Sequence, residues 1–172
     1  MTAGGIANGV ILGENDAVIR SIVGTLLRQA GQQVFLAADG SEAVLLARQF
    51  KARLVLLDIA MPRLNGLLAC KAIRALPGYA EVPVVMLTGY GLEPVREAAQ
   101  RVGASDFITK PFSPADLLAR LAVHLDMPEH ALPAGARVWD THPESRPIGA
   151  ENTRLRVGSE MVRIWRGAER NS

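Results

Sequence analysis

Short apolar runs alternate with amphipathic stretches along the first three quarters of the chain. Five runs are too short for helices and are predicted as strands, at residues 10–12, 33–37, 54–57, 82–87 and 106–109. Each is followed by apolar residues at helical spacing, which predicts helices over about 16–30, 41–51, 67–75, 94–101 and 113–125. Strict alternation of strand and helix predicts an α/β domain, a parallel sheet covered by helices on both faces.

Local signals refine this pattern. The run 54–57 is apolar at every position, which is typical of a strand inside a parallel sheet. Asp16 and Ser41 are expected to cap the first and second helices, because their side-chain oxygens can accept from free backbone amides. The apolar residues of the first predicted helix, which we expect to form its buried face, are Val18, Ile22, Val23, Leu26 and Leu27.

The composition changes near Met127. Residues 128–172 hold four prolines, seven arginines and no lysine, and a segment of this size is marginal as an independent domain. We therefore expect a flexible N-terminal arm over 1–8, one α/β domain over 9–127 and a C-terminal extension over 128–172. Three interpretations of the extension stay open: a hairpin over 153–165, turning at Gly158 and Ser159, disorder, or docking on the first domain.

Composition excludes several classes of protein. The single cysteine, Cys70, rules out an intramolecular disulfide and a thiolate zinc cluster. The formal net charge of +2 comes from 19 basic and 17 acidic residues, too near balance to indicate nucleic-acid binding. No apolar run reaches the roughly 18 residues of a membrane span, and no basic, apolar leader opens the chain. The expected location is the cytoplasm, without membrane contact.

Polar residues that could carry chemistry follow four of the five predicted strands. They are Glu14 and Asn15, Asp58, Thr88 and Lys110. Taken singly, each has an ordinary structural explanation as a helix cap, a turn residue or a solvated charge. Together they place complementary charges at the carboxyl edge of one sheet, which is where ligands bind in open α/β folds.

Four segments then resemble the receiver domain of response regulators, the phosphoacceptor module of two-component signalling. They are VILGEND with Arg20 after it, LVLLDIAMPRLNG, VVMLTGY and GASDFITKPFSP, and the resemblance spans about residues 9–126. The chain resembles receivers of the chemotaxis type. It implies a flavodoxin-like, doubly wound (βα)5 fold with strand order 2-1-3-4-5.

The resemblance also implies a role for each residue of the cluster. Asp58 would accept a phosphoryl group from a phosphohistidine, with Mg²⁺ as cofactor. Lys110 and Thr88 would contact the phosphoryl oxygens, and Phe107 would switch rotamer as Thr88 moves. The Lys110–Pro111 peptide is often cis in such domains. The implied magnesium ligands are Glu14, Asn15, Asp58 and the backbone carbonyl of Ala60.

Asn15 departs from the family pattern, which usually has an acid at this position. An amide oxygen can bind Mg²⁺ but brings no charge, so we expect a competent receiver with weakened magnesium affinity. The alternative is a degenerate receiver that binds proteins without being phosphorylated. A phosphatase of the haloacid dehalogenase type would need an acid where Ala60 stands, so the chain is expected not to be an enzyme, beyond assisting its own phosphorylation and dephosphorylation.

The implied partners are a sensor histidine kinase or histidine phosphotransfer protein and a downstream protein target. The extension lacks the length and helical pattern of a DNA-binding output domain, so no DNA binding is expected. A homodimer is conceivable through Asp106 and Arg120, at positions where some receivers form dimer salt bridges. The competing interpretation, slightly favoured, is a surface ion pair that contributes little to stability.

Overall fold

A computed structural model describes residues 9–89, 93–125, 127, 150–157 and 160–167. Five parallel strands form one sheet in the order β2-β1-β3-β4-β5. The strands are β1 (Gly9–Gly13), β2 (Val34–Ala37), β3 (Ala52–Asp58), β4 (Val84–Thr88) and β5 (Asp106–Thr109). The helices that connect and follow them are α1 (Ala17–Gln29), α2 (Gly40–Gln49), α3 (Gly66–Arg74), α4 (Glu93–Arg101) and α5 (Pro114–Leu125). The predicted flavodoxin-like fold and strand order are confirmed.

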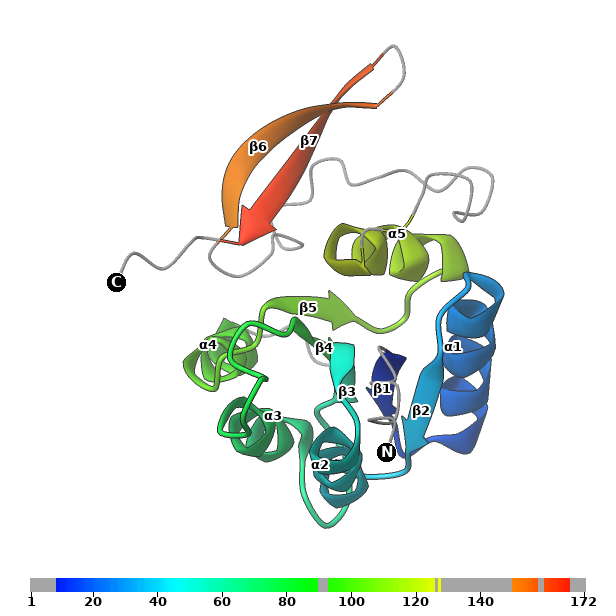
Figure 1. The fold of residues 1–172 in the computed structure, drawn as a ribbon, viewed down its shortest axis with the longest axis vertical. Coiled ribbons are helices and arrows are strands. Elements are labelled where there is room, and N and C mark those ends of the chain that lie inside the picture. The colour runs from blue at the N-terminus through cyan, green and yellow to red at the C-terminus, as the bar shows by residue number, and fades with distance from the viewer. Residues whose placement is uncertain (1–8, 90–92, 126, 128–149, 158–159, 168–172) are drawn as a thin grey trace, which may run out of the picture.

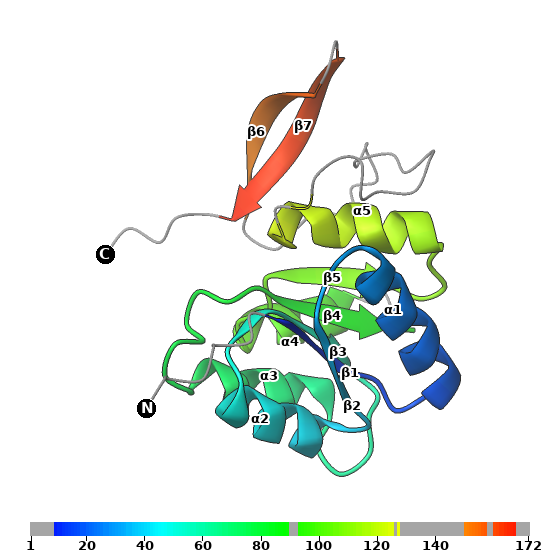
Figure 2. The same cartoon turned by 45° about the vertical axis from the view of Figure 1, so that its right-hand side comes forward.

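The helices form a layer on each face of the sheet. Helices α1 and α5 cover one face, and α2, α3 and α4 cover the other (Figures 1 and 2). Val23 and Leu27 of α1 meet Leu117 and Leu121 of α5 in one apolar cluster, whereas α2, α3 and α4 pack on the second. The central strand β3 is buried on both faces, as its continuous apolar run predicted.

Two local predictions are wrong. The cap of α2 is Asp39 and not Ser41, because the Asp39 side chain accepts from the Glu42 amide while the Glu42 carboxylate accepts from the Ala38 amide. Val18 and Ile22 do not lie on the buried face of α1, since they are 67% and 52% exposed. The buried face of this helix is therefore narrower than the apolar face that its sequence forms.

The apolar cluster on which α2, α3 and α4 pack includes the cysteine. Cys70 of α3 is fully buried, with its sulfur 3.4 Å from the carbonyl oxygen of Val102. Burial raises the pKa of its thiol to about 11. Cys70 therefore behaves as a small apolar residue of the core.

The C-terminal extension contains two strands, β6 (Ala150–Val157) and β7 (Glu160–Gly167). They pair antiparallel, with Leu155 opposite Val162. Strands are thus present where the hairpin was predicted, although they are longer than expected. The predicted arm at 1–8 and the predicted turn at 158–159 lie outside the described residues. No helix in the described part of the chain is long and apolar enough to cross a membrane.

Candidate functional site

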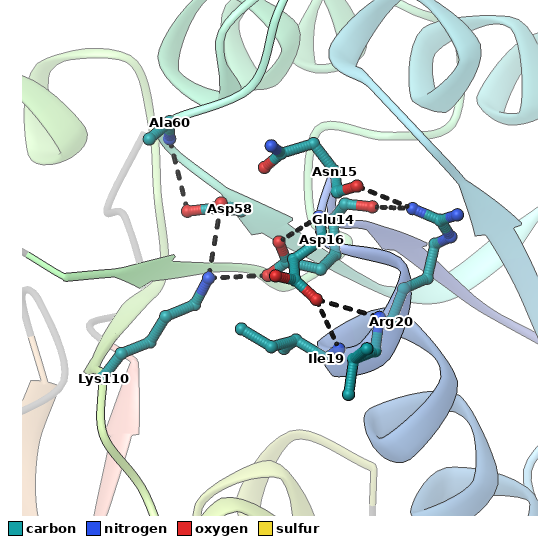
Figure 3. A network of polar contacts seen from close by, with 9 residues as sticks. Glu14, Asn15, Asp16, Ile19, Arg20, Asp58, Ala60 and Lys110 are labelled. Carbon is teal, nitrogen blue, oxygen red and sulfur yellow. Dashed lines mark hydrogen bonds and ion pairs between the residues drawn. The ribbon is translucent and has the colours of Figure 1, made fainter.

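The carboxyl ends of the strands bring the polar residues of the sequence together. Asp58 is the last residue of β3, Glu14 follows β1, and Lys110 follows β5. Figure 3 shows these three side chains converging from separate strands. Thr88 ends β4, one residue beyond Leu87, the register partner of Asp58, and is buried. Parallel pairing thus creates the charged edge that the sequence predicted.

Lys110 connects the two carboxylates. Its Nζ lies 2.7 Å from Glu14 Oε2 and 3.3 Å from Asp58 Oδ2. Glu14 is completely buried and Asp58 is 4% exposed, so the three charges interact away from bulk water. Burial raises the pKa of Glu14, and the neighbouring Asp58 charge adds to this, although Lys110 opposes it. Two carboxylates share one cation, which leaves the site with excess negative charge.

The start of α1 fixes the backbone on one side of the site. Asp16 caps this helix by accepting from the amides of Val18 and Ile19, as predicted, and these hydrogen bonds lower the pKa of Asp16. The Asp16 amide in turn donates to Glu14 Oε1 at 3.0 Å. Arg20 donates to the carbonyl oxygens of Glu14 and Asn15 at 2.6 and 3.2 Å (Figure 3). This role of Arg20 was not predicted.

The loop after β3 is held close to Asp58 on the other side. The Ala60 amide donates to Asp58 Oδ1 at 3.2 Å. Gly66 lies so close to the chain that a Cβ there would collide with the Asp58 carbonyl oxygen. Arg63 adopts a left-handed backbone (φ 62°) and pairs with the buried Asp39. An arginine in this conformation is costly, so the loop is held by its contacts rather than by local preference.

Asn15 completes the group of polar atoms. Its side-chain oxygen lies toward the carbonyl oxygen of Ala60 and Asp58 Oδ2, so that oxygens from three residues converge here. Turning the amide over would instead let its nitrogen donate to these two oxygens, at 3.0 and 3.2 Å. Every residue that the resemblance assigned to the metal therefore lies in one place.

The donor set fits magnesium. It offers two carboxylates, a backbone carbonyl and an amide oxygen, and hard oxygen ligands of this kind suit Mg²⁺. Among the described residues no group of three or more His, Cys, Asp or Glu side chains could hold a metal. A site here would therefore depend on the neutral oxygens of Ala60 and Asn15 as well as on Glu14 and Asp58.

The predicted switch residue Phe107 lies inside the protein. It is 2% exposed, and the guanidinium carbon of Arg96 lies 5.6 Å from the centre of its ring. The amide of Lys110 donates to the carbonyl oxygen of Thr88, and the Lys110–Pro111 peptide is cis, as the resemblance implied.

The expectation for Asp106 and Arg120 needs correction. They are not an exposed surface pair, because both are buried and hydrogen-bonded to each other within the chain, at 2.9 and 2.7 Å. A dimer contact through these residues stays a prediction. His124 Nε2 lies 3.3 Å from the same carboxylate. Although burial alone would raise the pKa of Asp106, the hydrogen bonds from His124 and Arg120 hold it below its ordinary value. The pair connects β5 to α5.

Comparison with known families decides the classification. The model of the response regulator receiver domain matches residues 10–122. The chain belongs to the response regulator receiver domain family. A phosphoacceptor role in two-component signalling is therefore supported, and the degenerate alternative is not favoured.

Curated relatives of this receiver are regulators of transcription by name. The "Probable transcriptional regulator ycf27" of Pyropia yezoensis is 38% identical over 112 residues, which cover 65% of this chain and 45% of the relative. The protein of the same name from Cyanophora paradoxa is 36% identical over 161 residues, or 94% of this chain and 63% of the relative. The chain thus spans about half to two thirds of the length of these relatives.

Solved structures with the same fold are receivers. Chemotaxis protein CheY4 of Vibrio cholerae is 32% identical, with a TM-score of 0.65 over 66% of this chain and 95% of that one. The receiver domain of a sensor histidine kinase from Pseudomonas aeruginosa PAO1 is 32% identical, with a TM-score of 0.65 over 70% and 98% of the two chains. That structure holds a magnesium ion in its active-site cleft.

Proposed function

We propose that Asp58 accepts a phosphoryl group from a phosphohistidine and that this modification changes a protein-binding surface of the receiver. One observation carries the proposal: Lys110 bridges Glu14 and Asp58 at the carboxyl edge of the sheet, at 2.7 and 3.3 Å. A nearly buried carboxylate at the end of a strand, beside a cation, can be both nucleophile and anchor for an anionic product.

The chemical step is a displacement at phosphorus. An oxygen of Asp58 forms a bond to phosphorus, the bond from phosphorus to the imidazole nitrogen of the donor breaks, and that nitrogen keeps the electron pair. The product is an acyl phosphate on Asp58. Lys110 balances charge on the phosphoryl oxygens, and the Ala60 amide, already 3.2 Å from Asp58, is a second donor on the same side.

Magnesium is the cofactor we propose for this step. Glu14, Asn15, Asp58 and the Ala60 carbonyl would hold it, and when bound it neutralises charge that builds up between the phosphoryl group and the carboxylates. The excess negative charge of the site supports this role, since Lys110 alone does not balance Glu14 and Asp58.

The partners follow from the same proposal. A histidine kinase or histidine phosphotransfer protein would supply the phosphoryl group in the cytoplasm, and a downstream protein would bind the changed surface. The expected absence of DNA binding stays a prediction, and the names of the longer relatives bear against it for a whole regulator. A homodimer contact through Asp106 and Arg120 stays a prediction as well.

The decisive experiment measures the mass of the intact chain after incubation with an acyl phosphate and Mg²⁺. We expect one added phosphoryl group in the native chain and none in Asp58→Ala. Asp116→Asn is the control, because it removes an exposed carboxylate in the first turn of α5 that contacts Ser113 and takes no part in the contacts of Glu14, Asp58 and Lys110. This control should be labelled like the native chain. Hydroxylamine should release the adduct, because an aspartyl phosphate is an acyl phosphate.

Two outcomes would contradict the proposal. Labelling that persists in Asp58→Ala would place the reaction on another residue. A folded native chain that gains no mass at any magnesium concentration, with either an acyl phosphate or a phosphorylated histidine protein, would favour the receiver that acts without phosphorylation.

A further inference from the structure

Asp39 is a buried carboxylate that the proposed function does not use. It lies two residues after the end of β2, at the same edge of the sheet as Asp58. One of its oxygens caps α2 by accepting from the Glu42 amide, and the other pairs with Arg63. A buried carboxylate is costly unless a cation or several donors satisfy it, so Asp39 and Arg63 depend on each other.

Arg63 belongs to the loop that follows Asp58. This loop spans residues 59–65 between β3 and α3, and Arg63 has a left-handed backbone in it (φ 62°), which costs free energy for any residue with a side chain. The Arg63 side chain is 70% exposed, so burial of apolar surface does not hold it in place. The pair with Asp39 is an interaction that can offset the cost of this backbone conformation.

A second contact joins the same loop to α2. The Gly40 amide donates to the carbonyl oxygen of Leu64 at 3.1 Å, and a Cβ at Gly40 would collide with that oxygen. The start of α2 thus contacts two successive residues of the loop, Arg63 through charge and Leu64 through a backbone hydrogen bond. Of these two contacts, the charge pair is the one that a side-chain substitution removes.

The other end of the loop carries atoms that the reaction would use. The Ala60 amide donates to Asp58 Oδ1 at 3.2 Å (Figure 3), and the Ala60 carbonyl oxygen is one of the proposed magnesium ligands. The Gly66 amide donates to the carbonyl oxygen of Ile59 at 3.0 Å, which joins the two ends of the loop. A displacement of Arg63 can therefore be passed on to Ala60, only three residues earlier.

We propose that Asp39 and Arg63 are positioning residues, whose ion pair holds the loop 59–65 so that Ala60 keeps its carbonyl oxygen at the metal site beside Asp58. This inference rests on the proposed function and adds two residues that are not among the proposed ligands. Residues that orient a metal ligand from outside the coordination sphere change metal affinity by about 10- to 100-fold when they are substituted.

The test measures magnesium affinity by calorimetry in Arg63→Met, Arg63→Lys and Asp39→Asn, without a phosphoryl donor. Arginine, lysine and methionine are all unbranched at Cβ, so the backbone preference at this position stays the same while the charge is kept or lost. In Asp39→Asn the side-chain oxygen can still accept the capping bond from the Glu42 amide. This variant keeps the test decisive if Arg63→Met, which leaves a buried carboxylate without its cation, does not fold.

We expect Arg63→Met and Asp39→Asn each to bind Mg²⁺ about tenfold more weakly than the native chain. Arg63→Lys, which keeps the charge, should recover most of this loss. The double variant should be no weaker than the single ones, because either substitution already breaks the pair.

Two controls make the same exchanges of side chain elsewhere. Arg101→Met removes the cation of an exposed pair with Glu97, and Asp116→Asn removes a carboxylate from the first turn of α5. Both controls should bind Mg²⁺ as the native chain does.

Hydrogen exchange gives a readout that does not depend on metal. In Arg63→Met the amides of Gly40 and Gly66, which join the loop to α2 and close it, should exchange with solvent faster than in the native chain. The Ala104 amide, which donates to the carbonyl oxygen of Ala99 at 3.0 Å, lies outside this loop and should keep its rate.

Three results would each overturn the inference. They are native magnesium affinity in both Arg63→Met and Asp39→Asn, an Arg63→Lys variant as weak as Arg63→Met, and unchanged exchange of the loop amides in Arg63→Met. Labelling of Asp58 in the native chain tests the proposed function separately. A native chain that is labelled while the variants bind Mg²⁺ normally removes only the inference. A native chain that is not labelled, although the variants lose magnesium affinity as expected, removes only the phosphoryl transfer.

Discussion

In the described part of this receiver, the buried charges at the carboxyl edge of the sheet and those between β5 and α5 are arranged in opposite ways. At the carboxyl edge of the sheet, Glu14 and Asp58 share one cation, Lys110. Between β5 and α5, the single carboxylate of Asp106 receives the guanidinium of Arg120 and the imidazole of His124. The pKa of Glu14 is raised, first by burial, whereas hydrogen bonds hold the pKa of Asp106 low despite its burial.

The difference separates a reactive site from a structural one. A buried carboxylate that is paired with several hydrogen-bond donors, as Asp106 is, has its charge neutralised within the protein and has no need of a further cation. Where carboxylates outnumber cations, as at Glu14 and Asp58, a metal ion can neutralise the remaining negative charge. The cation already present, Lys110, can then pair with an incoming phosphoryl group. Burial alone therefore does not distinguish the clusters, and the balance of charge does.

The largest expected effect comes from removing the cation of each cluster. Arg120→Met should destabilise the chain by about 3–5 kcal/mol, because it leaves a buried carboxylate without its main partner. Lys110→Met should cost about 1–2 kcal/mol, since Glu14 can take up a proton instead, but it should impair labelling of Asp58. Urea unfolding in metal-free buffer near neutral pH measures the change in stability of both variants.

Arg101→Met is the control for these two variants. Arg101 forms an exposed pair with Glu97 at 3.8 Å, and its loss should change stability by no more than about 0.5 kcal/mol. If Arg120→Met cost no more than this control, the buried pair would not be a structural element.

A second, smaller effect is the loss of stability at acid pH that comes from Asp106. Because the pKa of Asp106 is lower in the folded chain than its ordinary value near 3.8, the unfolded chain binds more protons between these two values. Stability from this group is present above that window and is lost as the pH falls through it. The stability gap between the native chain and Asp106→Asn should therefore shrink from about pH 5 to about pH 2.5 in urea unfolding. A gap that stays constant would contradict the charge-pair interpretation.

The smallest effect has the opposite sign. Glu14→Gln should stabilise the metal-free protein by about 0.5–1 kcal/mol, because a raised pKa means that folding penalises the ionised form. The same variant should bind Mg²⁺ less tightly. Glu81→Gln, an exposed position, should change neither quantity. A lower melting temperature for Glu14→Gln in EDTA would show that Glu14 stabilises the site it shares.

The fold followed from the sequence because the alternation of apolar runs and amphipathic stretches restricts the architecture to few choices. The two local errors, the cap of α2 and the buried face of α1, arose where two residues or two sets of residues carry similar sequence signals. Ser41 and Asp39 are both good caps, and the reciprocal bond from Glu42 decides for Asp39. Val18 and Ile22 are four residues apart, as are Val23 and Leu27, but only Val23 and Leu27 lie on the side of the helix that is buried.

The site was predictable to the extent that strand ends determine it. Glu14, Asp58 and Lys110 each follow a strand, so parallel pairing alone brings them together. The pair of Arg63 and Asp39 joins two separate loops and left no such signal. The hydrogen bonds of Arg20 are local, but they depend on the path of its long side chain back to the carbonyl oxygens of Glu14 and Asn15, which no sequence pattern indicates. The same holds for Asp106 and Arg120, whose burial depends on how closely α5 packs on β5.

The inert state of Cys70 has a practical consequence for watching this receiver at work. The chain has no other cysteine, and a thiol with a pKa of about 11 inside the core is almost never a thiolate at neutral pH. A cysteine engineered at an exposed position such as Ile22 would be the one readily alkylated group, without deleting the natural residue. A single fluorophore or spin label could then follow phosphorylation and magnesium binding in an otherwise native molecule.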